Sequence, residues 1–320
     1  MKLSVPLGIG TLHFGSLLDR AASRKVILRA IDKGVSFFDT APLYGNSLAE
    51  EILGDVLLEV HEKVLIATKV GLCVSKRRDQ TFGVEVARLN ASNLISSVES
   101  SLKRLKRESI DLLMLHAFDP STPIAETLNA LVQLHEQGKI KKIGCSNYNP
   151  VQLQHLLKKV PDNLPFVAAQ CHYNMIERRA GRKFIPLCEQ NEVWVVVNRA
   201  LARGALTGQY VLGQRFRNES RAAMSPRIQK WLTPQKLKTL DSLSFIAKES
   251  GTTLTKISLK WLLKNHSQMI VLLGVRNCDQ MEECLQTVSS EIDTAVFEKI
   301  EALLRNELDV YKLPSRYFEK

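Results

Sequence analysis

The sequence predicts an α/β fold of the (β/α)8 TIM-barrel type, formed by a single domain that covers residues 1–320. Short β-branched segments alternate with helical segments eight times along the chain. The strand segments are nearly continuous apolar runs, which is typical of parallel strands buried on both faces. At 320 residues the chain has about the usual length of one such barrel. No shift in composition and no linker rich in Pro, Gly or Ser marks a second domain.

Eight strands are expected, each a short apolar or β-branched run. They are Leu7–Thr11, Val35–Asp39, Val64–Lys69, Ile110–His116, Ile143–Ser146, Val167–Gln170, Val193–Asn198 and Met269–Gly274. Each is followed by a helical segment. The expected helices are Ser23–Lys33, Ser47–Val60, Ala91–Leu105, Ile124–Gln137, Pro150–Lys159, Arg182–Asn191, Leu237–Ser250, an additional Thr255–Asn265, and Asp279–Val288 with more helix beyond it.

Residues at the helix ends agree with these assignments. Ser23 and Asn149 can cap a helix, and Pro150 suits a first turn. Gly34 and Gly138 suit a helix stop. Three segments are too long for plain connections or follow the last helix, and we expect them to shape the barrel mouth and select the substrate. They are Gly71–Asn90, Arg199–Gln235 and the tail Asn306–Lys320.

Composition and charge exclude several classes of protein. The net charge is +11, but aromatic residues do not interleave the basic clusters as a stacking platform for single-stranded nucleic acid would require. The longest apolar runs are about five residues, far below the roughly 20 needed to span a bilayer. The first residues do not resemble a secretory signal, and six scattered cysteines form no C-x-x-C pair. We therefore expect a cytoplasmic protein with reduced thiols and no metal site.

Charged and polar residues stand at the carboxyl ends of three successive strands. Asp39 ends the second strand, with Tyr44 five residues later, Lys69 ends the third and His116 ends the fourth. The carboxyl ends of barrel strands meet at one mouth, so these side chains should converge. A tyrosine with a pKa near 10 is a poor acid or base at neutral pH, but an adjacent ammonium favours the phenolate. Alone, each residue would more often be structural; together they predict a proton-relay site.

Read in order, the motifs of this chain resemble those of the aldo-keto reductases. The resemblance covers nearly the whole sequence, and it rests on six segments in the order that the family shows. These segments are Gly8–Gly15, Phe37–Gly45, Ala67–Lys69, Met114–His116, Gly144–Asn147 and Leu201–Gly204. It implies reduction of an aldehyde or ketone with NADPH, or the reverse oxidation, by a barrel without a Rossmann fold. Consistently, no G-x-G-x-x-G follows the first strand.

The resemblance also implies roles for single residues. Tyr44 matches the family's proton donor, and Asp39, Lys69 and His116 match the rest of its catalytic tetrad. The remaining matches concern the cofactor. By resemblance, cofactor binding is expected of Thr11, Ser146, Asn147, Gln170, Asn198, Leu201, Arg203, Gly204, Gly274, Arg276, Gln280 and Glu283.

Three parts of the cofactor are assigned in this way. By resemblance, Ser146, Asn147 and Gln170 would hold the carboxamide of the nicotinamide. The loop Leu201–Gly204 would hold the pyrophosphate, and Gly274–Glu283 would hold the adenosine phosphate. Arg276 is the candidate for a 2′-phosphate, because a guanidinium offers paired donors to phosphate oxygens.

The chain departs from the family pattern at three places. Asn198 stands where an aromatic residue usually lies beneath the nicotinamide, and Glu283-Cys284 replaces an acidic-Asn pair. NADPH is the expected cofactor and NADH the alternative. The short N-terminus lacks most of the β-hairpin that closes the barrel bottom in the family.

Two other function classes are alternatives to the enzyme, of which nucleic-acid binding is disfavoured: we expect no nucleic-acid partner and no membrane partner. One is a cofactor-binding regulatory or sensor subunit that resembles the potassium-channel β subunits, which would bind nucleotide and turn over slowly. The other is a nucleic-acid binder, whose affinity would fall steeply with salt and ignore Tyr44. For the enzyme, Thr40–Gly45 has the form seen in sugar-oxidising members, so the expected partner is a small carbonyl or sugar-like molecule. The sequence predicts no oligomeric state.

Overall fold

The computed structural model describes residues 3–76, 82–216, 218, 220, 222–265 and 268–305. The chain divides into two compact units. The first comprises Met1–Cys171, Gly181–Asn198 and Gln268–Met281, and the second comprises His172–Ala180, Arg199–Ser267 and Glu282–Lys320. The tail that we expected at the mouth, residues 306–320, lies outside the described residues.

Eight parallel strands among the described residues close into a barrel, which confirms the predicted fold class. In order around the barrel the strands are β1 (Leu7–Gly10), β10 (Met269–Leu273), β9 (Trp194–Asn198), β8 (Phe166–His172), β7 (Ile143–Ser146), β6 (Leu112–Leu115), β3 (Leu65–Val70) and β2 (Phe37–Asp39). Every strand therefore lies next to its sequence neighbours in the barrel, as right-handed β-α-β connections require. The described residues before β1, 3–6, form no strand.

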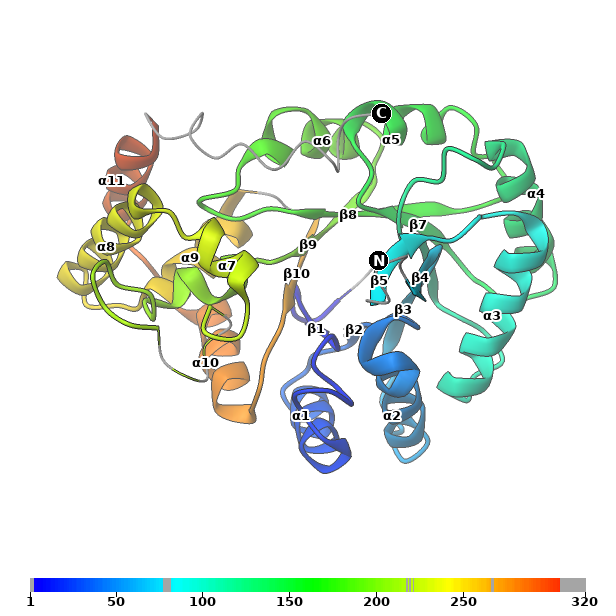
Figure 1. The fold of residues 1–320 in the computed structure, drawn as a ribbon, viewed down its shortest axis with the longest axis horizontal. Coiled ribbons are helices and arrows are strands. Elements are labelled where there is room, and N and C mark those ends of the chain that lie inside the picture. Colours follow the sequence, from blue (N-terminus) through cyan, green and yellow to red (C-terminus); the bar gives the residue numbers. More distant parts are fainter. Residues whose placement is uncertain are drawn as a thin grey trace. The chain divides into compact units, whose positions relative to one another are not determined.

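Helices follow the barrel strands as predicted. The helices of the first unit are α1 (Arg20–Asp32), α2 (Leu48–Leu57), α3 (Ala91–Leu105), α4 (Ile124–Glu136), α5 (Pro150–Leu157) and most of α6 (Arg179–Gln190). Figure 1 shows α1 to α4 in succession, each in contact with the next. The second unit contains η2 (Ala202–Thr207), α7 (Pro226–Trp231), α8 (Pro234–Glu249), α9 (Leu254–Asn265), most of α10 (Cys278–Ser289) and α11 (Thr294–Arg305).

Side-chain caps fix several helix starts. Asn149 and Gln152 form a complete capping box at α5, with Pro150 in the first turn, as predicted. The Ser23 cap is wrong: α1 begins at Arg20, and Asp19 accepts a hydrogen bond from the Ala22 amide. Ser23 is buried inside the helix instead, and its hydroxyl donates to the Leu18 carbonyl.

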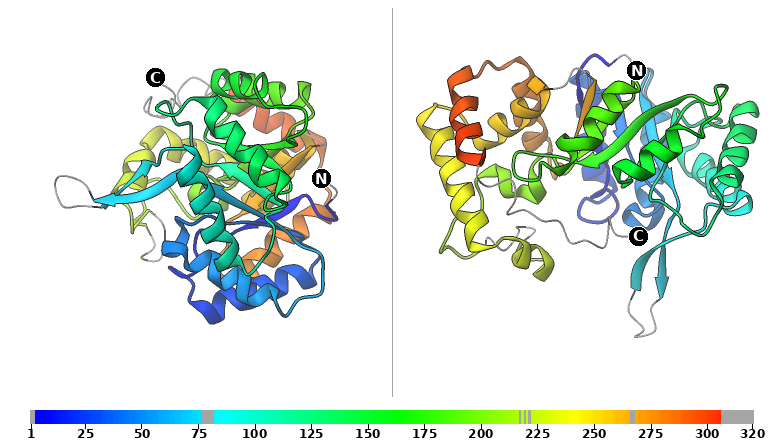
Figure 2. Two further views of the ribbon diagram at one scale, coloured as in Figure 1. Left: turned by 90° about the vertical axis from the view of Figure 1, so that its right-hand side faces the viewer. Right: turned by 90° about the horizontal axis from the view of Figure 1, so that it is seen from above.

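The segment after β3, which we expected to shape the barrel mouth, forms a β-hairpin. Strands β4 (Leu72–Lys76) and β5 (Phe82–Val86) pair antiparallel, and Figure 2 shows them projecting away from the barrel. Asp119 anchors the hairpin's base by accepting the Leu89 amide at 2.8 Å. Partial burial would raise the pKa of Asp119, but hydrogen bonds donated by the Ser121 and Thr122 hydroxyls and by the Leu89 and Ser121 amides lower it to about 2.

An apolar cluster fills the barrel lumen below the mouth. Its members are Phe37, Ala67, Leu112, Met114, Ala168, Val196, Ile270 and Leu272. Leu3, Leu65, Val167 and Trp194 pack against it. Gly8 leaves room for this packing, because a Cβ there would lie 2.8 Å from Phe37 Cδ1. The lumen is therefore a packed core, as in other barrels of this type.

In the part of the chain that the structure describes, no helix is long and apolar enough to cross a membrane.

Candidate active site

The polar residues at the strand ends continue the pattern of the lumen cluster. Asp39 follows Phe37 by two residues, Lys69 follows Ala67, and His116 follows Met114. Gln170 and Asn198 stand in the same relation to cluster residues of β8 and β9. Side chains two residues apart on a strand point to the same side. The side chains predicted for the site therefore form the layer above the apolar core, at the carboxyl ends of the strands.

Lys69 is the centre of this layer. Its Nζ donates to Asp39 Oδ1 at 2.6 Å, to the Thr40 carbonyl at 3.0 Å and to the Tyr44 hydroxyl at 3.2 Å. Lys69 and Asp39 are both almost fully buried. Burial by itself would lower the pKa of Lys69, but the Asp39 carboxylate and Tyr44 outweigh it and raise the pKa above its ordinary value. Lys69 is thus an ammonium at neutral pH, hydrogen-bonded to Tyr44.

The backbone after Tyr44 is unusual and places its side chain. Gly45, Asn46 and Ser47 all have left-handed conformations, with φ of 56°, 53° and 73°. A side chain at Gly45 would collide with the Phe14 carbonyl. Only glycine fits this position, because the chain both turns left-handed and touches neighbouring backbone. The turn brings Tyr44 back over the end of β3.

His116 completes the predicted tetrad. Its ring centroid lies 6.3 Å from that of Tyr44, with the two rings nearly perpendicular. Burial and the charge of Lys69 together hold the pKa of His116 well below its usual value. The imidazole is therefore neutral at neutral pH and can donate one N–H to a substrate oxygen.

Ser146, Asn147, Gln170 and Asn198 form a polar group at the ends of β7, β8 and β9. Gln170 Oε1 accepts from Ser146 Oγ at 2.9 Å and from Asn198 Nδ2 at 3.2 Å. Asn147 Nδ2 donates to the His116 carbonyl at 2.8 Å and to Ser146 Oγ at 3.1 Å. Three amides and a hydroxyl match the donors and acceptors of a carboxamide, so this set fits a nicotinamide.

Thr11 adds a second indication of a ligand. The Thr11 hydroxyl is fully buried just beyond β1, and it has no hydrogen-bond partner within the described residues. Unsatisfied buried hydroxyls are costly, and a ligand oxygen or nitrogen would satisfy this one.

Arg276 and Gln280 lie at the start of α10. The Arg276 amide donates to Gln280 Oε1 at 3.1 Å, and Asn277 caps the helix by accepting the Gln280 amide at 2.9 Å. No atom lies within 4 Å of a Cβ built on Gly274. A partly exposed guanidinium beside a helix start and an open backbone suits an anion such as a phosphate.

Leu201, Arg203, Gly204 and Glu283 belong to the second unit. In the turn η2 the amides of Ala202 and Gly204 donate to the carbonyls of Arg199 and Leu201, so these two backbone donors are already used within the turn. This differs from the expectation that the loop's backbone amides hold a pyrophosphate. The hydroxyl of Thr253 approaches Glu283 Oε1 at 3.5 Å.

The side chain of Arg203 lies in a buried charge cluster that the sequence did not predict. Its Nη1 donates to Glu177 Oε1 at 3.1 Å, and Asn174 Nδ2 donates to the other carboxylate oxygen at 2.9 Å. The Trp231 ring lies 4.9 Å from the Arg203 guanidinium and 4.1 Å from Lys236 Nζ. No periodic pattern in the sequence identifies Glu177. The only indication of a buried charge there is a carboxylate next to apolar residues.

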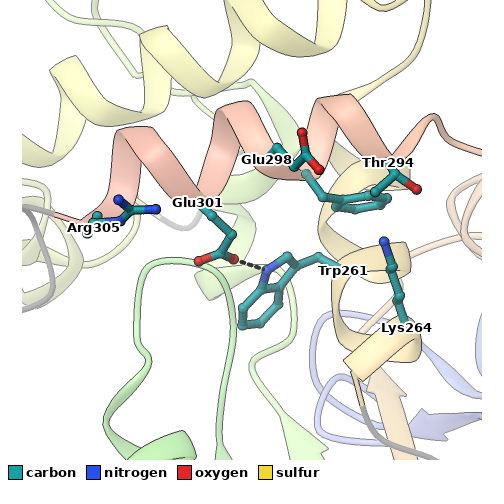
Figure 3. Close-up of a pocket in the computed structure, with 7 residues that line it drawn as sticks. Trp261, Lys264, Thr294, Glu298, Glu301 and Arg305 are labelled. Atoms are coloured by element: carbon teal, nitrogen blue, oxygen red, sulfur yellow. Dashed lines mark hydrogen bonds between the residues drawn. The ribbon is translucent and has the colours of Figure 1, made fainter.

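The second unit also contains a cavity of about 300 Å³ between α9 and α11. Figure 3 shows Glu301 directed at the Trp261 indole, which donates to it at 2.7 Å. Arg178 binds the same carboxylate through two nitrogens. None of the predicted site residues lines this cavity.

The fold and the strand-end residues fit the class of nicotinamide-dependent barrel oxidoreductases. The sequence model of the Aldo/keto reductase family matches residues 6–305. The chain therefore belongs to the aldo/keto reductase family, and it is an NAD(P)H-dependent oxidoreductase that acts on carbonyl compounds or the corresponding alcohols.

Individual relatives agree with this assignment. Aldo-keto reductase YhdN of Bacillus subtilis is 29% identical over 94% of this chain and 90% of its own. A probable voltage-gated potassium channel subunit beta of Arabidopsis thaliana is 28% identical over 92% of this chain and 90% of its own. The structure of the glycerol dehydrogenase AKR11B4 from Gluconobacter oxydans superimposes with a TM-score of 0.82 at 27% identity, over 97% of this chain and 94% of that one.

Proposed function

We propose that this protein reduces an aldehyde or ketone with NADPH, or oxidises the corresponding alcohol, with Tyr44 as the proton donor. The observation that carries the proposal is the position of Lys69 Nζ, which is hydrogen-bonded to both Asp39 and Tyr44. An ammonium in this position stabilises the phenolate that forms when Tyr44 releases its proton.

Each residue of the site has a separate role in the proposed reduction. When bound, a nicotinamide cofactor would supply the hydride, that is, both electrons and one hydrogen, for the carbonyl carbon. Tyr44 donates a proton to the carbonyl oxygen, so the product is the neutral alcohol. Lys69 balances the phenolate left on Tyr44, and Asp39 holds Lys69 charged. The neutral His116 donates a hydrogen bond to the carbonyl oxygen and orients it toward Tyr44.

The proposed residues for the cofactor are those of the resemblance. Ser146, Asn147, Gln170 and Asn198, with the unsatisfied Thr11 hydroxyl, would hold the nicotinamide end. Leu201, Arg203 and Gly204 would lie along the pyrophosphate, and Gly274, Arg276, Gln280 and Glu283 along the adenosine phosphate.

Preference for NADPH over NADH rests on Arg276. A charged hydrogen bond to the 2′-phosphate contributes roughly 1.5–3 kcal/mol. We therefore expect Arg276→Ala to weaken NADPH binding at least tenfold and to leave NADH binding nearly unchanged, measured by fluorescence titration. Equal weakening of both nucleotides would refute the phosphate assignment.

A sugar-like or polyol substrate is the proposed class. Support comes from Thr40–Gly45 and from the structural likeness to the glycerol dehydrogenase AKR11B4. The cytoplasm is the proposed location, supported by six cysteines that are all free thiols in the structure.

The test is steady-state oxidation of NADPH and NADH with a panel of aromatic aldehydes, dicarbonyls and sugars. We expect turnover that falls by roughly two to four orders of magnitude in Tyr44→Phe, because the general acid is lost. Tyr148→Phe, a buried tyrosine beside Phe118, is the matched control. Full activity in Tyr44→Phe would refute the proton donor. Tight nucleotide binding without turnover on any substrate would instead favour the regulatory role that the channel-subunit relative suggests.

A further inference from the structure

Gln170 on β8 lies across the lumen from Asp39 on β2. Three strands separate β8 from β2 in either direction around the barrel, so the two strands are opposite each other. Gln170 Nε2 nevertheless donates to Asp39 Oδ2 at 2.8 Å, and both residues are almost completely buried. This contact joins the residues expected to bind the nicotinamide to the residues expected to transfer the proton.

The orientation of the Gln170 amide is determined by its neighbours. Ser146 Oγ and Asn198 Nδ2 both donate to Oε1, while Nε2 faces the Asp39 carboxylate. A flipped amide would place its oxygen against the carboxylate and its nitrogen against the Asn198 amide donor. Such an arrangement is strongly unfavourable in a buried site, where unpaired polar groups are costly.

The second oxygen of Asp39 continues the network. Asp39 Oδ1 accepts from Lys69, which in turn donates to the Tyr44 hydroxyl. The N–H of Gln170 therefore stabilises part of the negative charge that Lys69 and Tyr44 experience. Lys69 is the titratable group that bonds this carboxylate directly; Tyr44 bonds Lys69, and the neutral His116 lies beside Tyr44, with ring centroids 6.3 Å apart.

We propose that Gln170 is a positioning residue for proton transfer: it orients Asp39 and, through Asp39 and Lys69, sets how readily Tyr44 releases its proton. This role is additional to gripping the nicotinamide, and its catalytic meaning rests on the proposed function. Without the Gln170 donor, Asp39 presents a less stabilised negative charge near Tyr44. The Tyr44 phenolate then becomes less favourable.

The test measures the ionisation of Tyr44 directly, in the protein without nucleotide. The ionisation midpoint of Tyr44 is followed by NMR of 13C-labelled tyrosine, with its signal assigned from Tyr44→Phe. We expect Gln170→Met to raise the midpoint by about one pH unit, and Gln170→Glu to raise it further, because a second carboxyl then faces Asp39. Ser146→Ala is the matched control; it should leave the midpoint unchanged, since Asn198 still donates to Gln170 Oε1.

An unchanged midpoint in the Gln170 variants would overturn the proposal. A shift of equal size in Ser146→Ala would also overturn it, because the effect would then not depend on the donor to Asp39. Gln170→Glu preserves the shape of the side chain and keeps the test available if Gln170→Met does not fold.

The outcome is separable from that of the proposed function. A shifted midpoint in a protein without turnover would retain this role for Gln170 and reject the reductase. Turnover with an unshifted midpoint would retain the reductase and reject this role for Gln170. In an active enzyme, the Gln170 variants should shift the pH midpoint of kcat together with the ionisation midpoint of Tyr44. If Gln170 only bound the cofactor, these variants would raise only the KM for the nucleotide.

Discussion

Each compact unit buries a carboxylate in contact with cations, and the two arrangements differ in their charge balance. In the first unit Asp39 is paired with one ammonium, Lys69, and receives one neutral donor from Gln170. In the second unit Glu177 is paired with Arg203, and the charges of Arg199 and Lys236 also act within this cluster. The first cluster is close to neutral, whereas the second carries an excess of positive charge.

Two buried lysines show what this difference does. The pKa of Lys69 is raised, because the nearby Asp39 and Tyr44 outweigh the effect of burial. The pKa of Lys236 is lowered to about 8: burial disfavours its charge, Glu177 compensates only partly, and Arg203 repels it. A balanced pair therefore keeps its lysine charged, whereas a cation-rich cluster suits the binding of an anion.

The largest effect is expected from breaking the balanced pair. Lys69→Met leaves Asp39 as an unpaired buried charge, so we expect a loss of about 3–5 kcal/mol in the free energy of unfolding. Turnover should also fall by roughly two to four orders of magnitude, since Tyr44 loses its ammonium. Urea denaturation and steady-state kinetics measure the two effects.

A double variant separates stability from catalysis in this pair. Asp39→Asn combined with Lys69→Met removes both charges, so stability should return substantially while turnover stays low. The exposed Lys248→Met is a control, expected to change stability by less than about 0.5 kcal/mol. Normal turnover in Lys69→Met would contradict the assigned role of the ammonium.

A smaller effect on folding is expected in the cation-rich cluster. In Arg203→Met the Glu177 carboxylate still accepts from Asn174 and, unlike Asp39 without Lys69, still has the charges of Arg199 and Lys236 nearby, so the cost should be roughly 1–3 kcal/mol. If the cluster binds the pyrophosphate, nucleotide affinity should fall at least tenfold while kcat at saturating nucleotide is unchanged. Calorimetric titration provides the affinity. Unchanged affinity would show that Arg203 only supports the fold.

The barrel was predictable because local sequence carries its signal. Strands such as Ile143–Ser146 are short apolar runs between polar segments, and a buried parallel strand needs nothing more. The hairpin after β3 was missed, although Leu72 and Val74 alternate with Cys73 and Ser75 as a strand requires. The length of this connection favours a loop, whereas its period of two favours a strand, and the second pattern is the one that the structure follows.

The residues of the first cluster were predictable, but their pairing was not. Strand-end position alone placed Asp39, Lys69 and Gln170 at one mouth. Which of them bond depends on barrel closure, which brings residues 131 positions apart to 2.8 Å. The Glu177 cluster was missed for a related reason, since Glu177, Arg203 and Lys236 follow no common period and meet only through tertiary packing.

The smallest expected effect is the pH dependence caused by Lys236. Its pKa of about 8 in the folded protein lies below the value of about 10.4 in an unfolded chain. Between these values the unfolded chain binds more protons, so Lys236 makes the free energy of unfolding rise with pH, and below pH 8 its buried charge opposes folding in full. We therefore expect the stability of wild type relative to Lys236→Met to increase between pH 8 and pH 10, measured by urea denaturation.

The exposed Lys230→Met is the control for this comparison and should give a difference that does not vary with pH. A constant difference for Lys236→Met as well would mean that its ammonium is not disfavoured by the fold. Lys69 provides the opposite case within the same protein. Because its pKa is raised, the contribution of Lys69 to the free energy of unfolding should stay constant between pH 8 and pH 10 and fall only at higher pH. A stability that rises with pH for Lys236 and stays constant for Lys69 would identify the local charge balance, rather than burial alone, as the deciding factor.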